Sequence, residues 1–457
     1  MPEFFAPLAR LPDGWARDVR FSVDAKGDIA AVTANAARGE AALLPGPTLP
    51  GLADLHSHAF QHAMAGLTER ATGGDDDFWS WRETMYGFLA KLAPRDMEAI
   101  ATRLYVELVK HGFTSVAEFH YVHADPKGEP YETVTEMADR AIAAAAAAGI
   151  GMTMLPVVYR AGGFGAAPLS ERQKRFALSE DVFADLYERL ARRHRGDPNV
   201  RVGIAPHSLR AVPPDHLARA VALARKLDKA APIHIHISEQ PKEVAECRAW
   251  SGTTPISWLA GNAPLDEHWC LVHATHATAD EIATMANARA VVGLCPTTEA
   301  NLGDGIFPLP EFLAQGGRFG IGTDSNVCQS PVEELRWLEY GLRLTRLKRN
   351  VVSRAAGGST GALLFAHAAE GGAQACGRKV GKLAAGWRAD FVVLDPEHPS
   401  LLARREDELV DTWLFSGNSN PVRDVVVGGE WVVREFHHRH EDQARADYAK
   451  SLGRLRS

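Results

Sequence analysis

The sequence lacks any arrangement of cysteines suited to cross-linking. Five cysteines occur among 457 residues, and none belongs to a Cys-x-x-Cys pair. This scattered pattern excludes a disulfide framework and favours a reducing compartment. The sequence also has no basic segment followed by a long apolar one near its start, and no run that approaches about 18 uninterrupted apolar residues. We therefore expect a cytoplasmic protein that does not bind a membrane.

An excess of positive charge is missing as well. Lysine and arginine together number 50, against 57 aspartates and glutamates, for a net charge of -7. This balance gives no electrostatic footprint for nucleic acid or for an anionic membrane. The composition is globular, with 46% hydrophobic and 23% charged residues, so a large core can form. We expect a small molecule as the partner.

From residue 51 onward, apolar segments typical of strands alternate with segments rich in helix-forming residues. The strand-like segments cover residues 51–58, 113–123, 150–160, 200–208, 232–240, 268–276, 290–298 and 318–326. A strand followed by a helix, repeated eight times, predicts an α/β protein with a (β/α)8 barrel of the TIM type. We place this barrel at residues 51–377.

Short β-like runs with glycine turns lie on both sides of the predicted barrel, in residues 1–50 and 378–435. We expect them to pair as one small composite β-sandwich domain. Residues 436–457 have a charged, helical pattern after a histidine-rich patch, which predicts a C-terminal helical tail on the solvated surface. As an alternative, which rests on composition alone, the histidines of this patch bind a metal adventitiously. They are His437, His438 and His440.

The first predicted strand ends in two histidines one residue apart, in the stretch GLADLHSH. A strand alternates its side chains between faces, so His56 and His58 project the same way while Ser57 points oppositely. The two imidazoles then converge on one point. Taken alone, this pair is explained equally well as polar residues where a strand leaves the core. The residues of the other strands are needed to distinguish this interpretation from a functional site.

Titratable residues gather at the C-terminal ends of the predicted strands, which form the active-site face of such a barrel. A catalytic divalent metal such as zinc accepts imidazole nitrogens and carboxylate oxygens and keeps one position for water. His56, His58, one histidine of the fifth strand and Asp324 after the eighth strand make up such a set. The fifth strand offers both His234 and His236, and we favour His236 because it is nearer the C-terminal end.

These residues resemble the amidohydrolase superfamily in four motifs: the His-x-His of strand one, HISE in strand five, LVHATH in strand six and GTDS in strand eight. Members with two bridged metals use a lysine or glutamate from the third or fourth strand, and MTMLPVVYR and VRVGIAPHS contain neither. This favours the mononuclear deaminase branch. Within it, DLHSHAFQHAMAGLTE, FWSWRE, AEFHYVH, HSLRAV and LCPTTEANLGDGIFP are similar to the formimidoylglutamate deiminases.

The resemblance implies hydrolysis of N-formimidoyl-L-glutamate to N-formyl-L-glutamate and ammonia, a step of histidine degradation. It implies one Zn2+ per subunit, although Fe2+ and Mn2+ accept the same donors, and coordination that lowers the pKa of bound water to about 7 and so supplies hydroxide. Asp324 is then both a ligand and the acceptor of the water's proton, while His273 orients the nucleophile. Glu239 delivers a proton to the departing nitrogen; its simpler interpretation is a carboxylate at a helix N-terminus.

The implied substrate is a dicarboxylate, which needs cationic groups in the pocket. Arg210, on the rim of the fourth strand, can form a bidentate pair with a carboxylate. The resemblance assigns further substrate contacts to Gln61, Arg82, Tyr121 and His207. As alternatives, Arg82 pairs with Glu83 or Glu107 on the surface, and Tyr121 and His207 are satisfied polar residues of the core.

Two positions depart from the family pattern, which has arginine at His62 and histidine at Asn326. Glu299 is left without a role. The family implies a homodimer. Two competing hypotheses are an aminohydrolase of the same branch that acts on a purine, pterin or triazine ring, and a catalytically silent barrel that serves as a scaffold.

Overall fold

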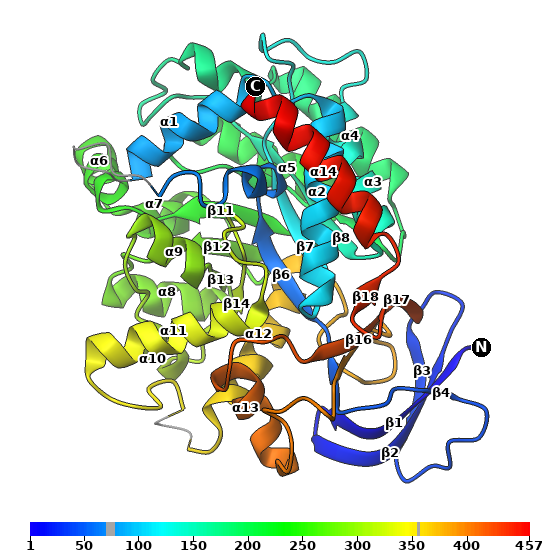
Figure 1. Cartoon of the computed structure of the whole chain (residues 1–457). Coiled ribbons are helices and arrows are strands. Elements are labelled where there is room, and N and C mark those ends of the chain that lie inside the picture. The colour runs from blue at the N-terminus through cyan, green and yellow to red at the C-terminus, as the bar shows by residue number, and fades with distance from the viewer. Residues whose placement is uncertain (70–77, 354–356) are drawn as a thin grey trace.

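The computed structural model describes residues 1–69, 78–353 and 357–457 (Figure 1). Short strands, almost entirely buried and paired in parallel, lie at its centre. They are β6 (Leu52–Ser57), β7 (Phe113–His120), β8 (Gly151–Val158), β9 (Val200–Val202), β10 (Ala205–Pro206), β11 (Ile233–Ile237), β12 (Trp269–His273), β13 (Val291–Leu294) and β14 (Arg318–Ile321). Within the described residues, each of the eight predicted segments contains one of these strands, and β9 with β10 makes up the fourth.

The strands pair in two groups that two parallel bridges join into a barrel. One group has the order β10-β8-β7-β6, with β9 beside β8, and the other has the order β11-β12-β13-β14. The bridge between Ile204 and Ile233 connects the groups on one side, and the bridge between Ser57 and Asp324 closes the barrel on the other. The predicted barrel is therefore confirmed, and three of the proposed metal ligands, His56, His58 and Asp324, lie at its closing seam.

Gly322 explains how the first and last strands of the barrel come so close. A Cβ atom at this position would lie 2.7 Å from the Cβ of His56 and 2.8 Å from the His56 carbonyl oxygen. Real Cβ atoms do not approach that closely in a packed interior. A residue without a side chain is therefore required where the chain enters the GTDS motif.

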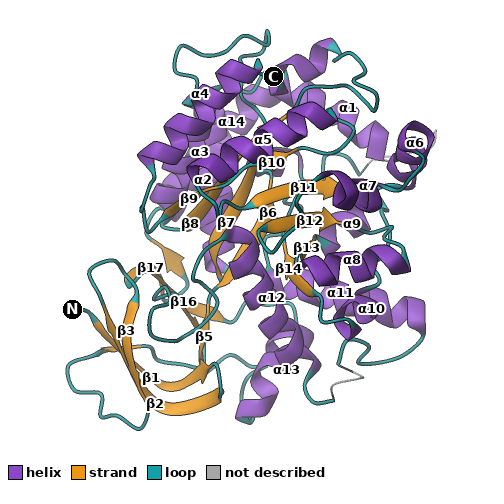
Figure 2. Ribbon diagram, turned by 180° about the vertical axis from the view of Figure 1, so that it is seen from behind, coloured by secondary structure: helices purple, strands orange, loops and turns teal. Residues whose placement is uncertain are grey.

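Helices surround the barrel (Figure 2). They are α1 (Phe78–Leu89), α2 (Pro94–Lys110), α3 (Glu136–Ala148), α4 (Glu180–Arg193), α5 (Pro214–Leu227), α6 (Pro241–Ser251), α7 (Pro255–Asn262), α8 (Ala279–Ala288), α9 (Pro296–Leu302), α10 (Leu309–Ala314), α11 (Pro331–Arg346) and α12 (Thr360–Cys376). Among the described residues, no helix has the length and apolarity needed to cross a membrane.

Helix α4 shows how the sequence specifies these elements. The hydroxyl of Ser179 accepts a hydrogen bond from the Val182 amide at 3.3 Å and so caps the first turn, as serine does at helix N-termini. Phe183, Leu186 and Leu190 are buried at intervals of three and four residues, which places them on one helix face. The predicted strand 290–298, by contrast, extends too far, because Pro296 begins α9 and proline suits the first turn of a helix.

The two ends of the chain form one sheet below the barrel (Figure 1). Its strands are β1 (Glu3–Leu11), β2 (Gly14–Val23), β3 (Ile29–Thr33), β4 (Ala42–Leu43), β5 (Thr48–Pro50), β15 (Phe391–Leu394), β16 (Val422–Val427), β17 (Glu430–Arg434) and β18 (His437–His438). Strand β15 lies between β5 and β16, and Phe4, Phe21 and Phe391 pack together in a separate core. The predicted pairing of the two ends is confirmed, in one continuous sheet of nine strands within the described residues.

The C-terminal helix α14 (Glu441–Arg456) lies against α2 (Figure 1). The Lys110 ammonium is 2.7 Å from the Glu441 carboxylate, and Leu455 is buried. His438 is buried too; its Nε2 donates to the carbonyl of Ala148 at 3.0 Å, while its Nδ1 accepts from the His440 amide at 3.0 Å. The tail thus packs one side against α2 while most of its residues are exposed, as expected of a solvated helix, and neither ring nitrogen of His438 is left for a metal.

Candidate metal centre and active site

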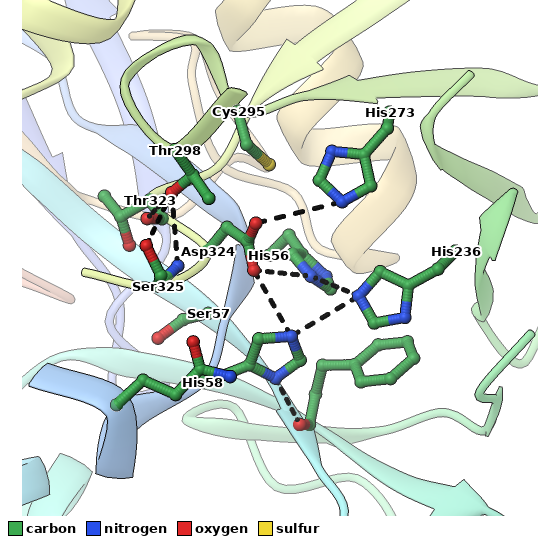
Figure 3. Close-up of polar contacts among 12 residues, drawn as sticks. His56, Ser57, His58, His236, His273, Cys295, Thr298, Thr323, Asp324 and Ser325 are labelled. Carbon is green, nitrogen blue, oxygen red and sulfur yellow. Dashed lines mark hydrogen bonds and ion pairs between the residues drawn. The ribbon is translucent and has the colours of Figure 1, made fainter. Parts of the chain in front are cut away.

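Four buried side chains meet at the C-terminal end of the barrel: His56, His58, His236 and Asp324 (Figure 3). One donor atom from each lies within 4.8 Å of the others. The Asp324 Oδ1 atom is 3.4 Å from His56 Nε2 and 3.3 Å from His58 Nε2, and the Nε2 atoms of His56 and His236 are 3.0 Å apart. The predicted pair on strand β6 thus faces the two further groups required for a catalytic metal site.

The hydrogen bonds of the rings indicate that these groups suit a cation. His58 Nδ1 lies 3.0 Å from the carbonyl of Phe119, and His236 Nδ1 lies 3.0 Å from the carbonyl of His207. A carbonyl only accepts, so each Nδ1 carries the hydrogen and each neutral ring presents a lone pair at Nε2. These two Nε2 atoms face each other at 3.4 Å. Two acceptors cannot bond each other, whereas a divalent cation between them binds both.

Electrostatics favour the forms that bind metal. Burial lowers the pKa of His56 to about 3 and also lowers those of His58 and His236. Burial alone would raise the pKa of Asp324, but the hydrogen bond from His56 and the positive charge of His273 hold it below its ordinary value. The site therefore offers neutral imidazoles and a carboxylate, the forms that a divalent metal requires.

His273 ends strand β12 beside this group. Its Nε2 is 3.8 Å from Asp324 Oδ2 and 3.9 Å from Glu239 Oε1, while its Nδ1 is 3.2 Å from Glu299 Oε1. Burial opposes a charge on His273, but Glu239, Glu299 and Asp324 outweigh it and raise its pKa to about 10. Its backbone has a φ of 68°, a left-handed conformation that is uncommon outside glycine and is found at functional sites.

Glu299, to which the sequence assigned no role, contacts His273. It accepts from the Cys295 amide at 3.0 Å as well as from His273. Since the carboxylate accepts from His273 Nδ1, it fixes the orientation of the ring and directs the His273 Nε2 atom toward the centre of the site. His273, Cys295 and Glu299 also lie close enough to one another to hold an ion, but these hydrogen bonds already account for their proximity.

Glu239 follows β11 and is buried at the start of α6. Burial raises its pKa to about 6, against the opposing charges of His273 and Arg210. The Arg210 guanidinium lies 3.9 Å from Glu239 Oε2. The backbone amide of Glu239 donates to Glu243 Oε2 at 3.0 Å, which holds the loop in place. A carboxyl group with a pKa near 6 can both donate and accept a proton close to neutral pH.

One pocket contains almost all of the predicted site residues. It is lined by His58, Gln61, Arg82, Tyr121, His207, Arg210, His236, Glu239, His273 and Asp324. The remaining predicted residue, His56, contacts His236 behind this surface. Gln61 Nε2 donates to the Tyr121 hydroxyl at 2.8 Å. His234, the alternative on β11, points elsewhere and bonds the carbonyl of Ala375 at 2.8 Å.

Arg82 lies on the pocket side of α1, and its Nε donates to the Tyr86 hydroxyl at 2.9 Å. Its two alternative partners are engaged elsewhere: Glu83 pairs with Arg172 and Glu107 pairs with Arg103. The surface ion pairs considered from the sequence are therefore not those that the structure records.

Sequence reasoning missed several residues of the pocket wall. They are Trp81, Met85, Tyr86, Tyr159, Phe176, Leu302 and Ser325. Tyr159 stands at the end of the third predicted strand, so the rule that strand ends form the site could have found it. Phe176 lies in a long connection after β8, where no periodic pattern marks it.

The chain belongs to the amidohydrolase family, a family of hydrolases. The model of the amidohydrolase family matches residues 48–432, which include the whole barrel. A second model, the N-terminal domain of formimidoylglutamate deiminase HutF, matches residues 1–42. The first match also includes β5, β15 and β16 of the terminal sheet.

Two curated relatives and one solved structure are similar to the chain over most or all of its length. The chain is 50% identical over 455 residues to formimidoylglutamate deiminase from Pseudomonas aeruginosa, and the comparison covers 100% of both chains. It is 30% identical over 392 residues to 5-methylthioadenosine/S-adenosylhomocysteine deaminase from Natronomonas pharaonis, covering 85% of this chain and 81% of that protein. A crystal structure of an amidohydrolase from Brucella melitensis is similar with a TM-score of 0.93 and 46% identity, covering 100% of both chains.

Proposed function

We propose that the protein hydrolyses N-formimidoyl-L-glutamate to N-formyl-L-glutamate and ammonia, a step of histidine degradation. The observation that carries this proposal is a single pocket that combines a buried cation-binding group with two arginines, Arg82 and Arg210. The cation-binding group suits hydrolysis of a carbon–nitrogen bond, and the arginines suit a dicarboxylate. Full-length similarity to a formimidoylglutamate deiminase supports the same substrate.

The proposed metal is one zinc ion per subunit, held by His56, His58, His236 and Asp324. Three imidazole nitrogens and a carboxylate oxygen are donors that zinc accepts, and Fe2+ or Mn2+ can replace it. When bound, such an ion supplies an activated water, because coordination lowers the pKa of water to about 7. Metal analysis of protein purified without chelator identifies the ion.

The residues around this position have complementary tasks in the proposed reaction. Asp324 accepts the proton of the attacking water, and His273 Nε2 orients that water, since Glu299 holds the ring from its other side. Attack on the formimidoyl carbon forms a tetrahedral intermediate. Glu239 then relays protons to the departing nitrogen, so that the proton that Asp324 accepted and the hydroxyl proton lost as the carbonyl forms both end on it, and it leaves as ammonia as the carbon–nitrogen bond breaks.

Arg82 and Arg210 are proposed to bind the carboxylates of the substrate, with Gln61, Tyr121 and His207 as further contacts. The Tyr86 hydroxyl accepts a hydrogen bond from Arg82 Nε and so holds the guanidinium on the pocket side of α1, and a guanidinium binds carboxylates in a defined geometry. Such charge-assisted bonds orient the formimidoyl end toward the metal group. A ring substrate would gain little from two arginines in this place.

Replacement of Arg210 by glutamine tests this orientation. We expect KM for formimidoylglutamate to rise by about 10- to 100-fold, as a bond to a charged group contributes about 1.5–3 kcal/mol, with a smaller effect on kcat. Steady-state kinetics measure both constants. As a control, Arg219→Gln removes an exposed arginine that pairs with Glu180 and should leave KM unchanged. An unchanged KM in the Arg210 variant would argue against a carboxylate contact.

The direct test of the proposed function follows the two products. We expect purified protein to release ammonia and N-formylglutamate in equal amounts from formimidoylglutamate, measured by a coupled ammonia assay and by NMR. Formamide and glutamate would instead reveal cleavage of the other carbon–nitrogen bond. Failure to turn over this substrate, together with deamination of a purine, pterin or triazine, would favour the ring-amine alternative.

We also propose a homodimer in the cytoplasm, on the basis of the family resemblance and the scattered, unpaired cysteines.

The domain limits stay predictions: a small β domain of residues 1–50 and 378–435, a barrel of residues 51–377 and a tail of residues 436–457. Light scattering measures the oligomeric state, and limited proteolysis tests the limits.

A further inference from the structure

The seam that closes the barrel is also the place where most of the metal group is held. On one side, His56 lies in β6 and His58 directly follows it; on the other, Asp324 follows β14. The His58 amide donates to the Asp324 carbonyl at 3.0 Å, and the Asp324 amide donates to the His56 carbonyl at 2.9 Å. A shift of one side of this seam against the other would therefore displace the donor atoms of three of the four groups.

Asn326 is fully buried at this seam and bonds both of its sides. Its Nδ2 donates to the carbonyl of Asp324 at 2.9 Å, to the carbonyl of His58 at 3.1 Å and to the hydroxyl of Ser57 at 3.3 Å. Its Oδ1 accepts from the hydroxyl of Thr323 at 2.7 Å. Every atom that this amide contacts thus belongs to Asp324 or His58 or to a residue directly beside one of the proposed ligands.

The backbone of Asn326 is held as firmly as its side chain. His62 Nδ1 and Gln329 Nε2 donate to its carbonyl at 3.2 and 2.7 Å. The His62 ring packs on Tyr448 of α14, with centroids 5.5 Å apart and planes at 31°. The φ of Asn326 is 59°, which asparagine tolerates better than most residues. The two departures from the family pattern, His62 and Asn326, therefore contact each other.

We infer that Asn326 is a positioning residue of the metal centre. Its amide crosslinks the two sides of the seam and so keeps the imidazoles of His56 and His58 at the correct separation from the Asp324 carboxylate, and His62 holds it from outside. This inference rests on the metal dependence of the proposed function but not on the identity of the substrate. Groups that hold metal ligands in place commonly change metal affinity by about 10- to 100-fold when they are removed.

The test is the rate at which the metal leaves the folded protein. Asn326→Gly removes the crosslinking amide but keeps a residue that accepts a positive φ. We expect zinc-loaded Asn326→Gly to release its metal to a chromogenic chelator about tenfold faster than the unmodified protein. The matched control is Asn35→Gly, because Asn35 is exposed and has a similar φ of 53°; its release rate should not change.

A second measurement separates positioning of the metal from general stability. Zinc should raise the Tm of the unmodified protein and of Asn35→Gly by the same amount, and should raise the Tm of Asn326→Gly by less, because weaker binding stabilises the fold less. A folded Asn326→Gly protein with an unchanged release rate and an unchanged zinc-dependent rise in Tm would overturn the inference.

A further variant keeps the inference testable if Asn326→Gly does not fold. His62→Phe retains an aromatic ring against Tyr448 but removes the donor to the Asn326 carbonyl, and we expect metal release to be faster than in the unmodified protein. Unchanged release in His62→Phe would overturn the role of His62 as a brace. Neither readout uses formimidoylglutamate, so a failure of this inference is distinguishable from a failure of the proposed substrate.

Discussion

Asp324→Asn should lower kcat/KM for formimidoylglutamate by about 10,000-fold, the upper range for loss of a general base. The substitution leaves the shape of the side chain but removes its charge and its ability to accept a proton. The seam itself should persist, because the amide and carbonyl of Asp324 that bond β6 belong to the backbone. Steady-state kinetics with added zinc, together with metal analysis, separate the loss of proton transfer from the loss of metal.

Asp390→Asn is the matched control for this substitution. Asp390 is buried like Asp324 but lies in the terminal sheet, where its carboxylate accepts from the Gly428 amide at 2.8 Å. We expect a lower Tm and an almost unchanged kcat/KM. If Asp324→Asn kept kcat/KM within tenfold of the unmodified protein while retaining its metal, the proposed role of Asp324 would be wrong.

The second large effect is expected for Glu239→Gln. We predict that kcat falls by about 1,000-fold, while KM changes little and the metal content stays the same. Glutamine preserves the volume of the side chain but cannot pass a proton to the departing nitrogen. Stopped assays for ammonia at saturating substrate measure this loss.

Glu243→Gln makes a useful comparison, since Glu243 is a buried glutamate in the first turn of α6, directly after the loop that carries Glu239. Its carboxylate accepts from the amides of Ser238 and Glu239 and does not line the pocket. An amide oxygen can still accept one of these bonds, so we expect a modest loss of kcat. Equal losses in the two variants would show that Glu239 acts through the shape of the loop rather than through proton transfer.

The barrel and the position of its site could be predicted because both depend on local patterns. Strand and helix patterns alternate along the chain, and the C-terminal ends of parallel strands meet on one face. This logic identified His56, His236 and Asp324 as neighbours although they lie far apart in the chain: 180 residues separate His56 from His236. The strand-end rule needs no information on register.

The rest of the site depends on contacts that no periodic pattern in the sequence predicts. Tyr86 enters the pocket from α1, and Phe176 enters from a long connection, so neither obeys the strand-end rule. The contact between Glu299 and His273 arises because α9 begins where a longer strand was expected. Likewise, the sequence marked His62 and Asn326 as unusual but could not reveal that they meet, because their contact depends on how the seam closes.

The sheet built from both ends of the chain has a consequence for the order of folding. Strand β5 pairs with β15, which is more than three hundred residues later in the chain, and the bridge between Ser57 and Asp324 closes the barrel only once β14 exists. Synthesis proceeds from the N-terminus. β5, His56 and His58 therefore cannot make these contacts until β14 and β15 have been synthesised. We expect the complete four-donor group to assemble late, so that metal is acquired by a nearly finished barrel rather than by a nascent chain.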